Sequence, residues 1–387
     1  MKTPKTSKLF ERKIDAVSGI GYYVLSTKVC EYQQGFYFIN NSMTKDGRYL
    51  WFRAAVNPIY NGVGRILAYI DFETDEIVLC HDTILCTDSA SPYVDDDNGD
   101  VYFTNGAGLY KRSIGKDEKA KLLCRPKVGG NVISLATHLT MTSDKKHFFL
   151  DARIGNHKFV QGLVNIETGD FEKWAESTHQ TNHGQINPTN DDLALCAYDH
   201  YSDIDTGEMR CIPTNEDGIY ERLWLISKDG ERKMCPAMNN YATHEWWSSD
   251  GKIIYYCCDN YGIYGIDVES GEDIAILEGV DPWHAHSNKD DKYFVFDEKR
   301  LERFGGKWYR GCPAALNFLN RKTGRCVKIV TEMPEIATPD KPCINNYHVD
   351  PHPRFTSNEK YIVFTTTELG SVDLAIAVVE EIVPFTE

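Results

Sequence analysis

The sequence predicts an all-β protein that folds as one seven-bladed β-propeller. The first observation is a polar turn followed by an apolar, aromatic and β-branched run, which recurs along the whole chain. The seven copies read "TKDGRYLWFRAAV", "DDDNGDVYFTN", "TSDKKHFFLDAR", "NPTNDDLALCAYD", "SSDGKIIYYCCD", "SNKDDKYFVFDE" and "TSNEKYIVFTTT". They recur at intervals of roughly 40 to 70 residues, close to the repeat length of propeller blades.

The second observation is a hairpin pattern that follows most of these copies. In "YIDFETDEIVLC", "LVNIETGDFEKW" and "YGIDVESGEDIAIL", a short turn with Asp or Gly joins two apolar runs. This is the short-range signal of a β-hairpin. A single small sheet leaves one face uncovered, whereas sheets arranged in a ring cover one another and leave only short edges. The pattern therefore favours a propeller.

The whole propeller is expected to form a single domain. We assign residues 1–18 to an N-terminal extension and residues 19–387 to the propeller. Two tandem β-sandwiches are the alternative, but they need a linker, and no Pro/Gly/Ser-rich stretch lies near the middle of the chain. To close the ring, the first strands after Gly19 and the last after Leu374 should share a blade.

Composition supports a large core and restricts the ligand classes. The 387-residue chain is 42% hydrophobic and 12% aromatic, which is typical of a globular protein rich in strands. Its formal net charge of −15 disfavours nucleic acids and anionic membranes as partners. A small acidic ligand is compatible with this charge only if its pocket is locally positive.

The sequence also predicts a soluble, cytoplasmic protein. The first residues, "MKTPKTSKLFERKID", contain no apolar signal segment, and no long apolar run follows. The 12 cysteines include no CxxC pair, so we expect buried thiols in a reducing compartment rather than a disulfide framework. The oligomeric state is left open by the sequence.

Histidines gather just before the repeated turns of the last four copies. Equivalent positions in a pseudo-symmetric ring project to the same end of the central channel, so several imidazoles should converge there. The alternative is that each histidine is an ordinary hydrogen-bonded residue in a loop. The histidines concerned are His183, His244, His284, His286, His348 and His352.

The stretch "NNYHVDPHPRF" places His348, Asp350 and His352 at alternate positions, which would share one face of an extended strand. Pro351 and Pro353 indicate an edge or a loop instead. With His284 or His286 from the preceding blade, these residues form a nitrogen and oxygen set suited to manganese, iron, zinc or nickel. Calcium stays open if carbonyls and water complete the shell.

Arg222 and His244 form a second group of candidates. An arginine beside a strand, as in "YERLWLISKDG", can hold a carboxylate with two hydrogen bonds, although a surface ion pair is the alternative. His244 lies next to Trp246 and Trp247, and burial against aromatic rings favours the neutral imidazole that a general base needs. The tryptophans could stack on a sugar ring or belong to the core.

Other enzyme classes leave little trace in the sequence. The chain contains no GxSxG nucleophile motif, no GxxxxGK[ST] phosphate loop and no HExxH zinc motif. The short Gly-containing stretches "GVGRI" and "GAGLY" lack the strand-to-helix setting of a dinucleotide site.

Several segments resemble the oligogalacturonate lyases, a family of cytoplasmic seven-bladed propellers that cleave short pectin oligomers by metal-assisted β-elimination. "FINNSMTKDGRYLWF" is similar to the first-blade segment of the family, and "HGQINPTNDDLALCA" to its His-x-Gln-x-x-x-Pro-Thr segment. "ERLWLISKDG" resembles its Arg-x-Trp strand, and "THEWWSSDG" its His-Glu-Phe-Trp motif. "WHAHSNKDD" and "VDPHPRFTSNE" resemble its two metal-binding segments, the second of which usually reads His-Pro-His-Pro-Ser-Phe-Thr.

The resemblance implies roles for particular residues. His244 stands where the family has its Brønsted base, and Arg222 where it has the arginine that holds the substrate. His284 and His352 match the first and last metal histidines. Asp350 occupies the place of a family histidine and Tyr347 the place of a glutamine ligand, with His348 or Asn346 nearby. A related propeller lyase acting on another uronic acid would fit this difference as well.

We therefore predict a metal-dependent lyase that cleaves uronic-acid oligosaccharides by β-elimination and gives a 4,5-unsaturated uronate. The expected cofactor is a divalent ion, Mn²⁺ first, with Ca²⁺, Zn²⁺, Fe²⁺ and Ni²⁺ as alternatives. The rival hypotheses are a non-catalytic propeller scaffold and a metal-dependent sugar hydrolase or isomerase. The predicted catalytic residues are His244, Arg222, His183 and His200. The predicted substrate-binding residues are Gln185, Trp246, Tyr347 and Arg354, and the predicted metal ligands are His284, His286, His348, Asp350 and His352.

Overall fold

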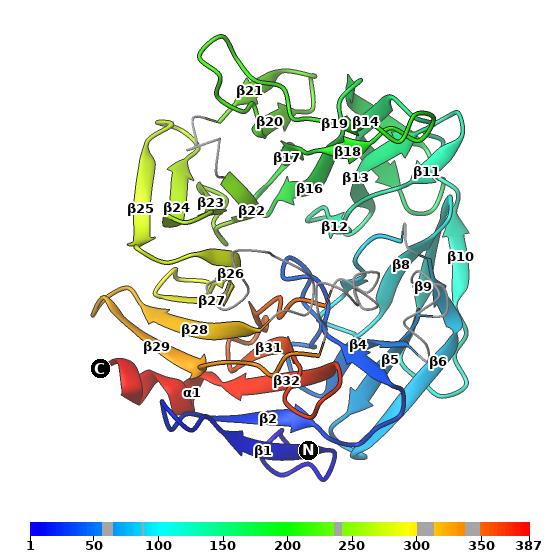
Figure 1. The fold of residues 1–387 in the computed structure, drawn as a ribbon. Coiled ribbons are helices and arrows are strands. Elements are labelled where there is room, and N and C mark those ends of the chain that lie inside the picture. The colour runs from blue at the N-terminus through cyan, green and yellow to red at the C-terminus, as the bar shows by residue number, and fades with distance from the viewer. Residues whose placement is uncertain (56–64, 87–88, 236–241, 300–312, 337–348) are drawn as a thin grey trace.

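The computed structural model describes residues 1–55, 65–86, 89–235, 242–299, 313–336 and 349–387. Within these residues, seven antiparallel sheets of four or five strands stand around a central axis (Figure 1). An additional hairpin, β18 (Tyr201–Ser202) with β19 (Met209–Arg210), projects from the fourth sheet. The seven-bladed propeller predicted from the repeats is confirmed.

Blades 1 to 3 follow one another in chain order. Blade 1 contains β3 (Tyr32–Gln34), β4 (Tyr49–Ala55), β5 (Arg65–Asp71) and β6 (Glu76–Leu85). Blade 2 contains β7 (Tyr93–Val94), β8 (Val101–Asn105), β9 (Gly108–Arg112) and β10 (Lys121–Cys124). Blade 3 contains β11 (Val132–Ser134), β12 (Thr140–Met141), β13 (His147–Ile154), β14 (Lys158–Asn165) and β15 (Phe171–Ser177).

Blades 4 to 6 continue the ring in the same order. Blade 4 contains β16 (Thr181–Asn187), β17 (Asn190–Tyr198), β20 (Leu223–Ser227) and β21 (Arg232–Met234). Blade 5 contains β22 (Ala242–Trp247), β23 (Ile253–Cys258), β24 (Gly262–Asp267) and β25 (Asp273–Glu278). Blade 6 contains β26 (Pro282–Ser287), β27 (Tyr293–Lys299), β28 (Ala314–Asn320) and β29 (Arg325–Val330).

Blade 7 joins the two ends of the chain. It contains β30 (Arg354–Phe355), β31 (Tyr361–Thr366), β32 (Asp373–Val378), β2 (Gly21–Leu25) and β1 (Phe10–Ile14). Tyr23 pairs with Ile376 and Val24 with Ala375, so the predicted closure of the ring is confirmed. The strand β1 lies within residues 1–18, yet it pairs with β2 along its length and forms the outer edge of this blade. A short helix, α1 (Val379–Ile382), and a 3₁₀ turn, Val383–Thr386, end the chain.

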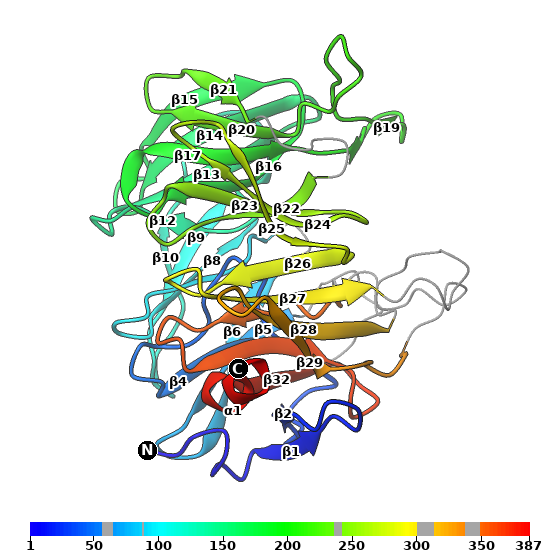
Figure 2. The same ribbon diagram turned by 90° about the vertical axis from the view of Figure 1, so that its left-hand side faces the viewer.

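The hydrophobic core is divided among the contacts between neighbouring blades. In the described chain, seven clusters of buried residues each lie between one blade and the next, and a smaller one lies within blade 3. For example, Trp51 of blade 1 packs with Phe103 of blade 2, and Trp246 of blade 5 packs with Phe294 of blade 6. In the view of Figure 2, the sheet β22–β25 lies against the sheet β26–β29. Each blade therefore covers the face that its neighbour cannot bury alone.

The repeated polar turns form because a side chain at the start of each turn bonds two residues ahead. The Thr44 hydroxyl donates to Asp46 Oδ1 at 2.6 Å, and the Ser248 hydroxyl donates to Asp250 Oδ1 at 2.8 Å. Such local bonds favour a turn over a continuing strand. The repeated polar motif in the sequence therefore forms a turn in the structure, and this turn ends each inner strand. No helix of the described chain is long and apolar enough to span a membrane.

Candidate active site

One position recurs on the channel side of every blade. It lies four residues before the residue that opens the repeated turn, and in blades 4, 5 and 6 it is the third residue of the innermost strand. Five of the seven blades carry a histidine at this position. The residues at this position, which we call the inner ring, are Asn40, Ser91, His138, His183, His244, His284 and His352.

Bulges turn the inner-ring histidines away from the regular strand pattern. The pairing register shifts around His183 in β16, around His244 in β22 and around His284 in β26. The backbone at His183, His244 and His352 is left-handed, with φ of 52°, 46° and 46°. Histidine adopts this conformation more readily than bulky residues do, and a bulge re-aims the side chain it carries. The imidazoles therefore leave the sheet and point along the channel wall.

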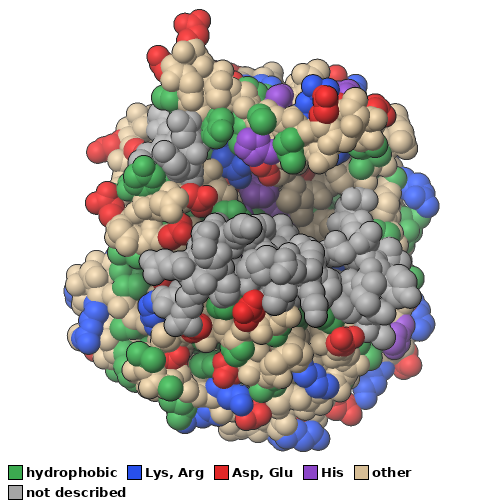
Figure 3. Space-filling model, viewed as in Figure 1, with side chains coloured by type: hydrophobic (Ala, Val, Ile, Leu, Met, Phe, Trp, Pro, Cys, Tyr) green, Lys and Arg blue, Asp and Glu red, His purple; other side chains and the backbone are tan. Residues whose placement is uncertain are grey.

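The five imidazoles form a continuous arc. Ring centroids are 5.6 Å apart for His138 and His183, 5.9 Å for His183 and His244, 4.2 Å for His244 and His284, and 4.2 Å for His284 and His352. Viewed down the axis, the molecule has a central hollow in which histidine side chains are visible (Figure 3). The predicted convergence of imidazoles from blades 4 to 7 is thus found, and blade 3 adds a fifth.

Tyr37 occupies the centre of this arc. Its ring lies 5.5 Å from His138, 5.9 Å from His183, 5.8 Å from His284 and 4.9 Å from His352, measured between centroids. It belongs to the segment between β3 and β4. Neither Tyr37 nor His138 was predicted from the sequence as a site residue. For His138 the available signal was its spacing, because it precedes Thr142 by the same four residues that separate His244 from Ser248.

His284, Asp350 and His352 form a group that could hold a metal ion. One ligand atom from each lies within 4.8 Å of the others, and all three residues are buried. Two imidazoles and a carboxylate match the donor preferences of Mn²⁺, Fe²⁺, Ni²⁺ and Zn²⁺. Asp297 supports the group: its carboxylate bonds to His284 Nδ1 at 2.9 Å and accepts the backbone N–H of His284 at 2.7 Å. Such a partner fixes the tautomer and leaves Nε2 to face an ion.

The other predicted metal ligands are placed differently. His348 lies outside the described residues. His286 is not part of the group, because the bulge at His284 breaks the alternation that would have aimed both histidines the same way. Residues 349–353 form no strand, so Asp350 and His352 converge through an irregular segment with Pro351 and Pro353 rather than through strand periodicity.

His183, Glu245 and Arg222 form a buried charged network on the opposite side of the arc. His183 Nδ1 lies 2.7 Å from Glu245 Oε1, and Arg222 Nη2 lies 3.5 Å from Glu245 Oε2. Burial acts to raise the pKa of Glu245, but attraction to His183 and Arg222 outweighs it and lowers the pKa to about 2. Arg222 Nη1 also donates to the carbonyl of Tyr198 at 3.1 Å. The guanidinium is therefore fixed at the channel wall.

His244 lies between the two groups. Its ring is 4.2 Å from that of His284 and 5.9 Å from that of His183. The Thr243 hydroxyl lies 2.9 Å from His244 Nδ1. The nearby large rings are Trp283, at 4.5 Å, and Phe38, at 6.1 Å, instead of the sequence neighbours Trp246 and Trp247. The His244 imidazole therefore lies beside His284, Asp350 and His352, which we call the metal-type group. The Thr243 hydroxyl orients one nitrogen of this imidazole.

Three further predicted residues, Trp246, Gln185 and His200, lie away from the arc. Trp246 packs in the core between blades 5 and 6, with its indole N–H 3.2 Å from the Ser287 hydroxyl. Gln185 is buried, and its amide donates to the carbonyl of Glu245 at 2.9 Å. His200 is exposed in the loop after β17, where its Nδ1 accepts the Ile212 N–H at 3.2 Å. Tyr347 lies outside the described residues.

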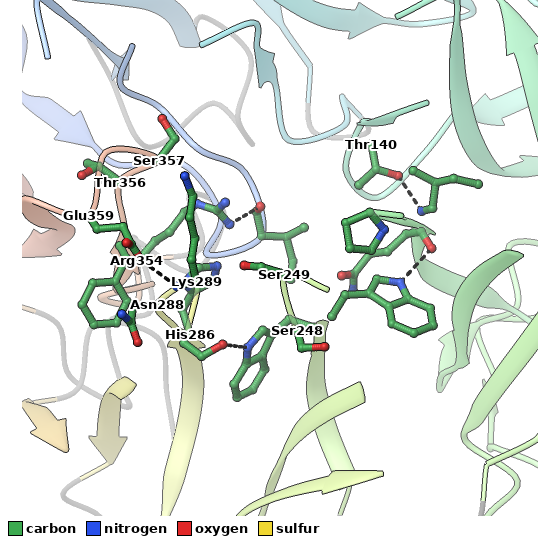
Figure 4. A pocket seen from close by; sticks show the side chains of 18 residues that line it. Thr140, Ser248, Ser249, His286, Asn288, Lys289, Arg354, Thr356, Ser357 and Glu359 are labelled. Atoms are coloured by element: carbon green, nitrogen blue, oxygen red, sulfur yellow. Dashed lines mark hydrogen bonds between the residues drawn. The ribbon is translucent and has the colours of Figure 1, made fainter. Parts of the chain in front are cut away.

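Gln185, Trp246, His286 and Arg354 line a separate cavity of about 240 Å³ (Figure 4). They lie two positions beyond the inner ring on β16, β22, β26 and β30, and the turns that end these strands complete the wall. Most of the described residues predicted from sequence thus lie either in the arc and its neighbouring charged network or around this cavity, whereas His200 lies at neither.

Comparison with known proteins agrees with the resemblance. No protein-family model matches the chain. It is 27% identical over 185 residues to an oligogalacturonate lyase of Dickeya dadantii (strain 3937), covering 44% of this chain and 46% of the relative. It is 26% identical over 230 residues to an oligogalacturonide lyase of Pectobacterium atrosepticum, covering 56% and 55%. The chain spans about half the length of the curated relatives it matches.

Two solved structures resemble the whole chain. An oligogalacturonate lyase in complex with manganese superposes with a TM-score of 0.70, at 18% identity, over 95% of this chain and 96% of that one. An oligogalacturonate lyase from Vibrio parahaemolyticus gives a TM-score of 0.72, at 18% identity, over 96% of both chains. These matches confirm the fold, and the two sequence matches confirm the resemblance to oligogalacturonate lyases.

Proposed function

We propose that this protein is a metal-dependent lyase that cleaves uronic-acid-containing oligosaccharides by β-elimination. The observation that carries the proposal is the contact between a metal-type group and a candidate base. His284, Asp350 and His352 bring their ligand atoms within 4.8 Å, and the His244 ring lies 4.2 Å from that of His284. The two curated relatives are lyases of oligogalacturonate and oligogalacturonide, which supports this reaction class.

His284, Asp350 and His352 would hold a divalent cation. Mn²⁺ is the first candidate, because the donor set suits it and a structural neighbour is described in complex with manganese. A cation held there supplies Lewis acidity next to a substrate carboxylate, whose negative charge otherwise makes the adjacent C5 proton difficult to remove. Asp297 keeps the His284 ring in the orientation that this binding requires.

His244 would accept the C5 proton as the general base. The electron pair of the C5–H bond would then form the C4–C5 double bond while the C4–O4 bond breaks, and the departing O4 would take a proton from water. The position of His244 between the metal-type group and the His183–Glu245–Arg222 network supports its role as the base, because a uronate held by these two groups would bring its C5 near the ring. Proton transfer to a positioned side chain typically contributes ~10²–10⁴-fold to the rate. The hydrogen bond between Thr243 Oγ1 and His244 Nδ1 fixes the ring for this task.

Arg222 would hold a carboxylate of the substrate in the acidic protein. Its guanidinium is buried beside the channel and is oriented by Glu245 and by the carbonyl of Tyr198. A fixed arginine recognises carboxylates through charge-assisted hydrogen bonds. His183, which shares Glu245 with Arg222, keeps this network in place. We extend the proposal to a cytoplasmic protein that acts on acidic oligosaccharides and binds neither nucleic acid nor membranes.

The first experiment follows ultraviolet absorbance from a 4,5-unsaturated uronate. Purified protein is incubated with oligogalacturonates and with other uronic-acid oligosaccharides, with added Mn²⁺ or with a chelator. We expect an absorbance increase that the chelator abolishes and Mn²⁺ restores. Formation of shorter sugars without an increase in ultraviolet absorbance would indicate a hydrolase instead. No product and no bound metal would favour a non-catalytic scaffold.

A further inference from the structure

The cavity at the turn end of the channel has its own chemical character. Its lining includes Arg354 and Lys289 from blades 7 and 6, with Glu359 as the nearby carboxylate. Ser248 and Ser249 of blade 5 and Thr140 of blade 3 add hydroxyl groups to the wall (Figure 4). The cavity thus combines two cationic side chains with several hydroxyls in a chain whose formal net charge is −15.

Arg354 makes no ion pair with a carboxylate in the described part of the chain, and the Asp96 carboxylate attracts it only from farther away. Its Nη1 donates to the carbonyl of Phe38 at 2.8 Å and also to the carbonyl of Ile39. These bonds to neutral oxygens orient the guanidinium but do not neutralise it. A partly buried guanidinium without a paired anion is unfavourable, so an anionic ligand in the cavity would lower its free energy.

Two further polar groups in this wall also lack hydrogen-bond partners among the described residues. His286 Nδ1 and Ser357 Oγ are buried and make no hydrogen bond there, and the same holds for Arg354 Nε. His286, Arg354 and Ser357 all line the cavity. Buried polar atoms are normally satisfied. These three have almost no exposed surface, so rotation of their side chains toward the cavity would let a bound ligand satisfy them.

Glu359 does not cancel this positive character. Its Oε1 accepts the backbone N–H of Lys289 at 2.6 Å, which draws the carboxylate to the turn of blade 6. The Lys289 side chain is exposed, and no ion pair engages it among the described residues. Lys289 therefore can reach over the cavity mouth toward a ligand.

The cavity is separate from the inner ring. Its lining includes no inner-ring residue and neither Asp350 nor Glu245. Arg354 and His286 lie two positions beyond the inner ring, roughly 7 Å at the usual rise of a strand, and the turn residues lie four positions beyond it, roughly 13 Å. A ligand could therefore occupy this cavity without occupying the metal-type group.

We propose that this cavity is a second binding site, which takes the carboxylate or phosphate group of a small hydroxylated molecule. Arg354 and Lys289 would bind the oxyanion, while Ser249, Ser357 and His286 would bond to its hydroxyl groups. The volume of about 240 Å³ lies below the range typical of drug-sized ligands, so the ligand is about the size of a monosaccharide. This inference does not depend on the lyase reaction.

Isothermal titration calorimetry of the full chain with three probes tests the proposal. The probes are inorganic phosphate, D-galacturonate and neutral D-galactose. We expect at least one anion to bind and galactose to give no comparable signal. Tighter binding of phosphate would identify a phosphorylated ligand, and tighter binding of galacturonate a sugar acid.

Variants then locate the bound anion. Arg354→Gln should weaken binding at least tenfold, and Lys289→Gln should weaken it several-fold. Lys292→Gln is the matched control, because Lys292 lies in the same turn but does not line the cavity. His284→Ala should leave this binding unchanged. Since Arg354 also bonds to two backbone carbonyls, Lys289→Gln keeps the test valid if Arg354→Gln fails to fold.

Three results would overturn the second site. Absence of binding by both anions would remove it. Unchanged affinity in both Arg354→Gln and Lys289→Gln would place the anion elsewhere. Loss of binding in His284→Ala alone would assign the anion to the inner ring.

Discussion

The two sides of the inner ring use the same residue type at equivalent positions for different chemistry. On the side of blades 6 and 7, His284 and His352 converge with Asp350 within 4.8 Å. On the side of blades 4 and 5, the carboxylate of Glu245 is bonded to His183 and lies near Arg222. The first arrangement leaves donors that converge on one point, and the second satisfies its carboxylate internally. The neighbours of each histidine, and not the histidine itself, decide which side can accept a cation.

We call the side of blades 6 and 7 the cation side. Removal of its carboxylate should have the largest effect on turnover. Asp350→Asn keeps the shape of the side chain but lowers the charge of the donor set, so we expect loss of bound metal. Turnover should fall by about 10³-fold or more, in line with the several kcal/mol that a metal supplies as a Lewis acid. Elemental analysis and the unsaturated-uronate assay measure the two effects.

Asp205→Asn is the matched control for this variant. Asp205 is exposed in the loop of the β18–β19 hairpin and belongs to another group that could hold a metal ion, with His157 and the buried Asp203. Retention of both metal and activity in Asp350→Asn would show that the two sides of the ring do not differ as described.

Replacement of the residue between the two sides should separate metal binding from catalysis. We choose His244→Asn, because asparagine tolerates the left-handed backbone found at φ 46° better than alanine does. Turnover should fall ~10²–10⁴-fold, the usual contribution of a general base, while metal content stays at the wild-type level. Equal loss of metal would instead make His244 part of the cation side, and unchanged turnover would remove it from the reaction.

On the side of blades 4 and 5, removal of the Glu245 charge should mainly lower the free energy of unfolding. The pKa of Glu245 is lowered to about 2 from a usual value near 4.5, so its ionised form stabilises the folded state above pH 4.5, and this contribution is lost as the pH falls toward 2. At pH 7 Glu245→Gln should reduce the free energy of unfolding by about 3 kcal/mol. Denaturant unfolding at pH 7 measures this change, and the difference from wild type should shrink below pH 4.

Glu221→Gln serves as a comparison, because Glu221 lies in the same segment as Arg222 but outside the network of Glu245. A similar loss in both variants would mean that the Glu245 network is no more important than a surface carboxylate.

The fold was predictable from the sequence because its determinants are local. Each blade repeats a turn whose first residue bonds two positions ahead, as Thr44 and Ser248 do, and an apolar strand follows each turn. The arc was partly predictable for a related reason. Equivalent positions in a closed ring must face the same channel, so His183, His244, His284 and His352 could be paired with one another from spacing alone.

The remaining site residues depended on features that spacing does not encode. A bulge at His284 sends His284 and His286 in different directions, although alternation would place them on one face. Gln185 and Trp246 likewise follow bulges, and they lie deeper along the inner strands. His138 was not predicted because the strand that follows it, β12, has only two residues. So short a strand gives no recognisable alternation of apolar and polar residues in the sequence.

The smallest expected effect concerns His138, which lies at the end of the arc next to His183. Both its ring nitrogens are buried without hydrogen-bond partners among the described residues, and burial together with the nearby His183 lowers its pKa to about 3. Between pH 6.5 and 3 the unfolded chain therefore binds one more proton at this residue than the folded chain does. As the pH decreases through this range, the contribution of His138 to the free energy of unfolding should decrease by up to ~1.4 kcal/mol per pH unit.

Asp151 acts in the opposite direction in part of this window, because burial raises its pKa to about 6 despite its hydrogen bonds. Its folded form binds the extra proton between pH 6 and 3.8, so the total slope of wild type understates the effect of His138. Comparison with His138→Phe isolates the histidine, since Asp151 is common to both proteins. The stability of the variant relative to wild type should rise as the pH falls from 6.5 to 4.5. A constant difference across this range would show that His138 is protonated as easily in the folded protein as in the unfolded chain.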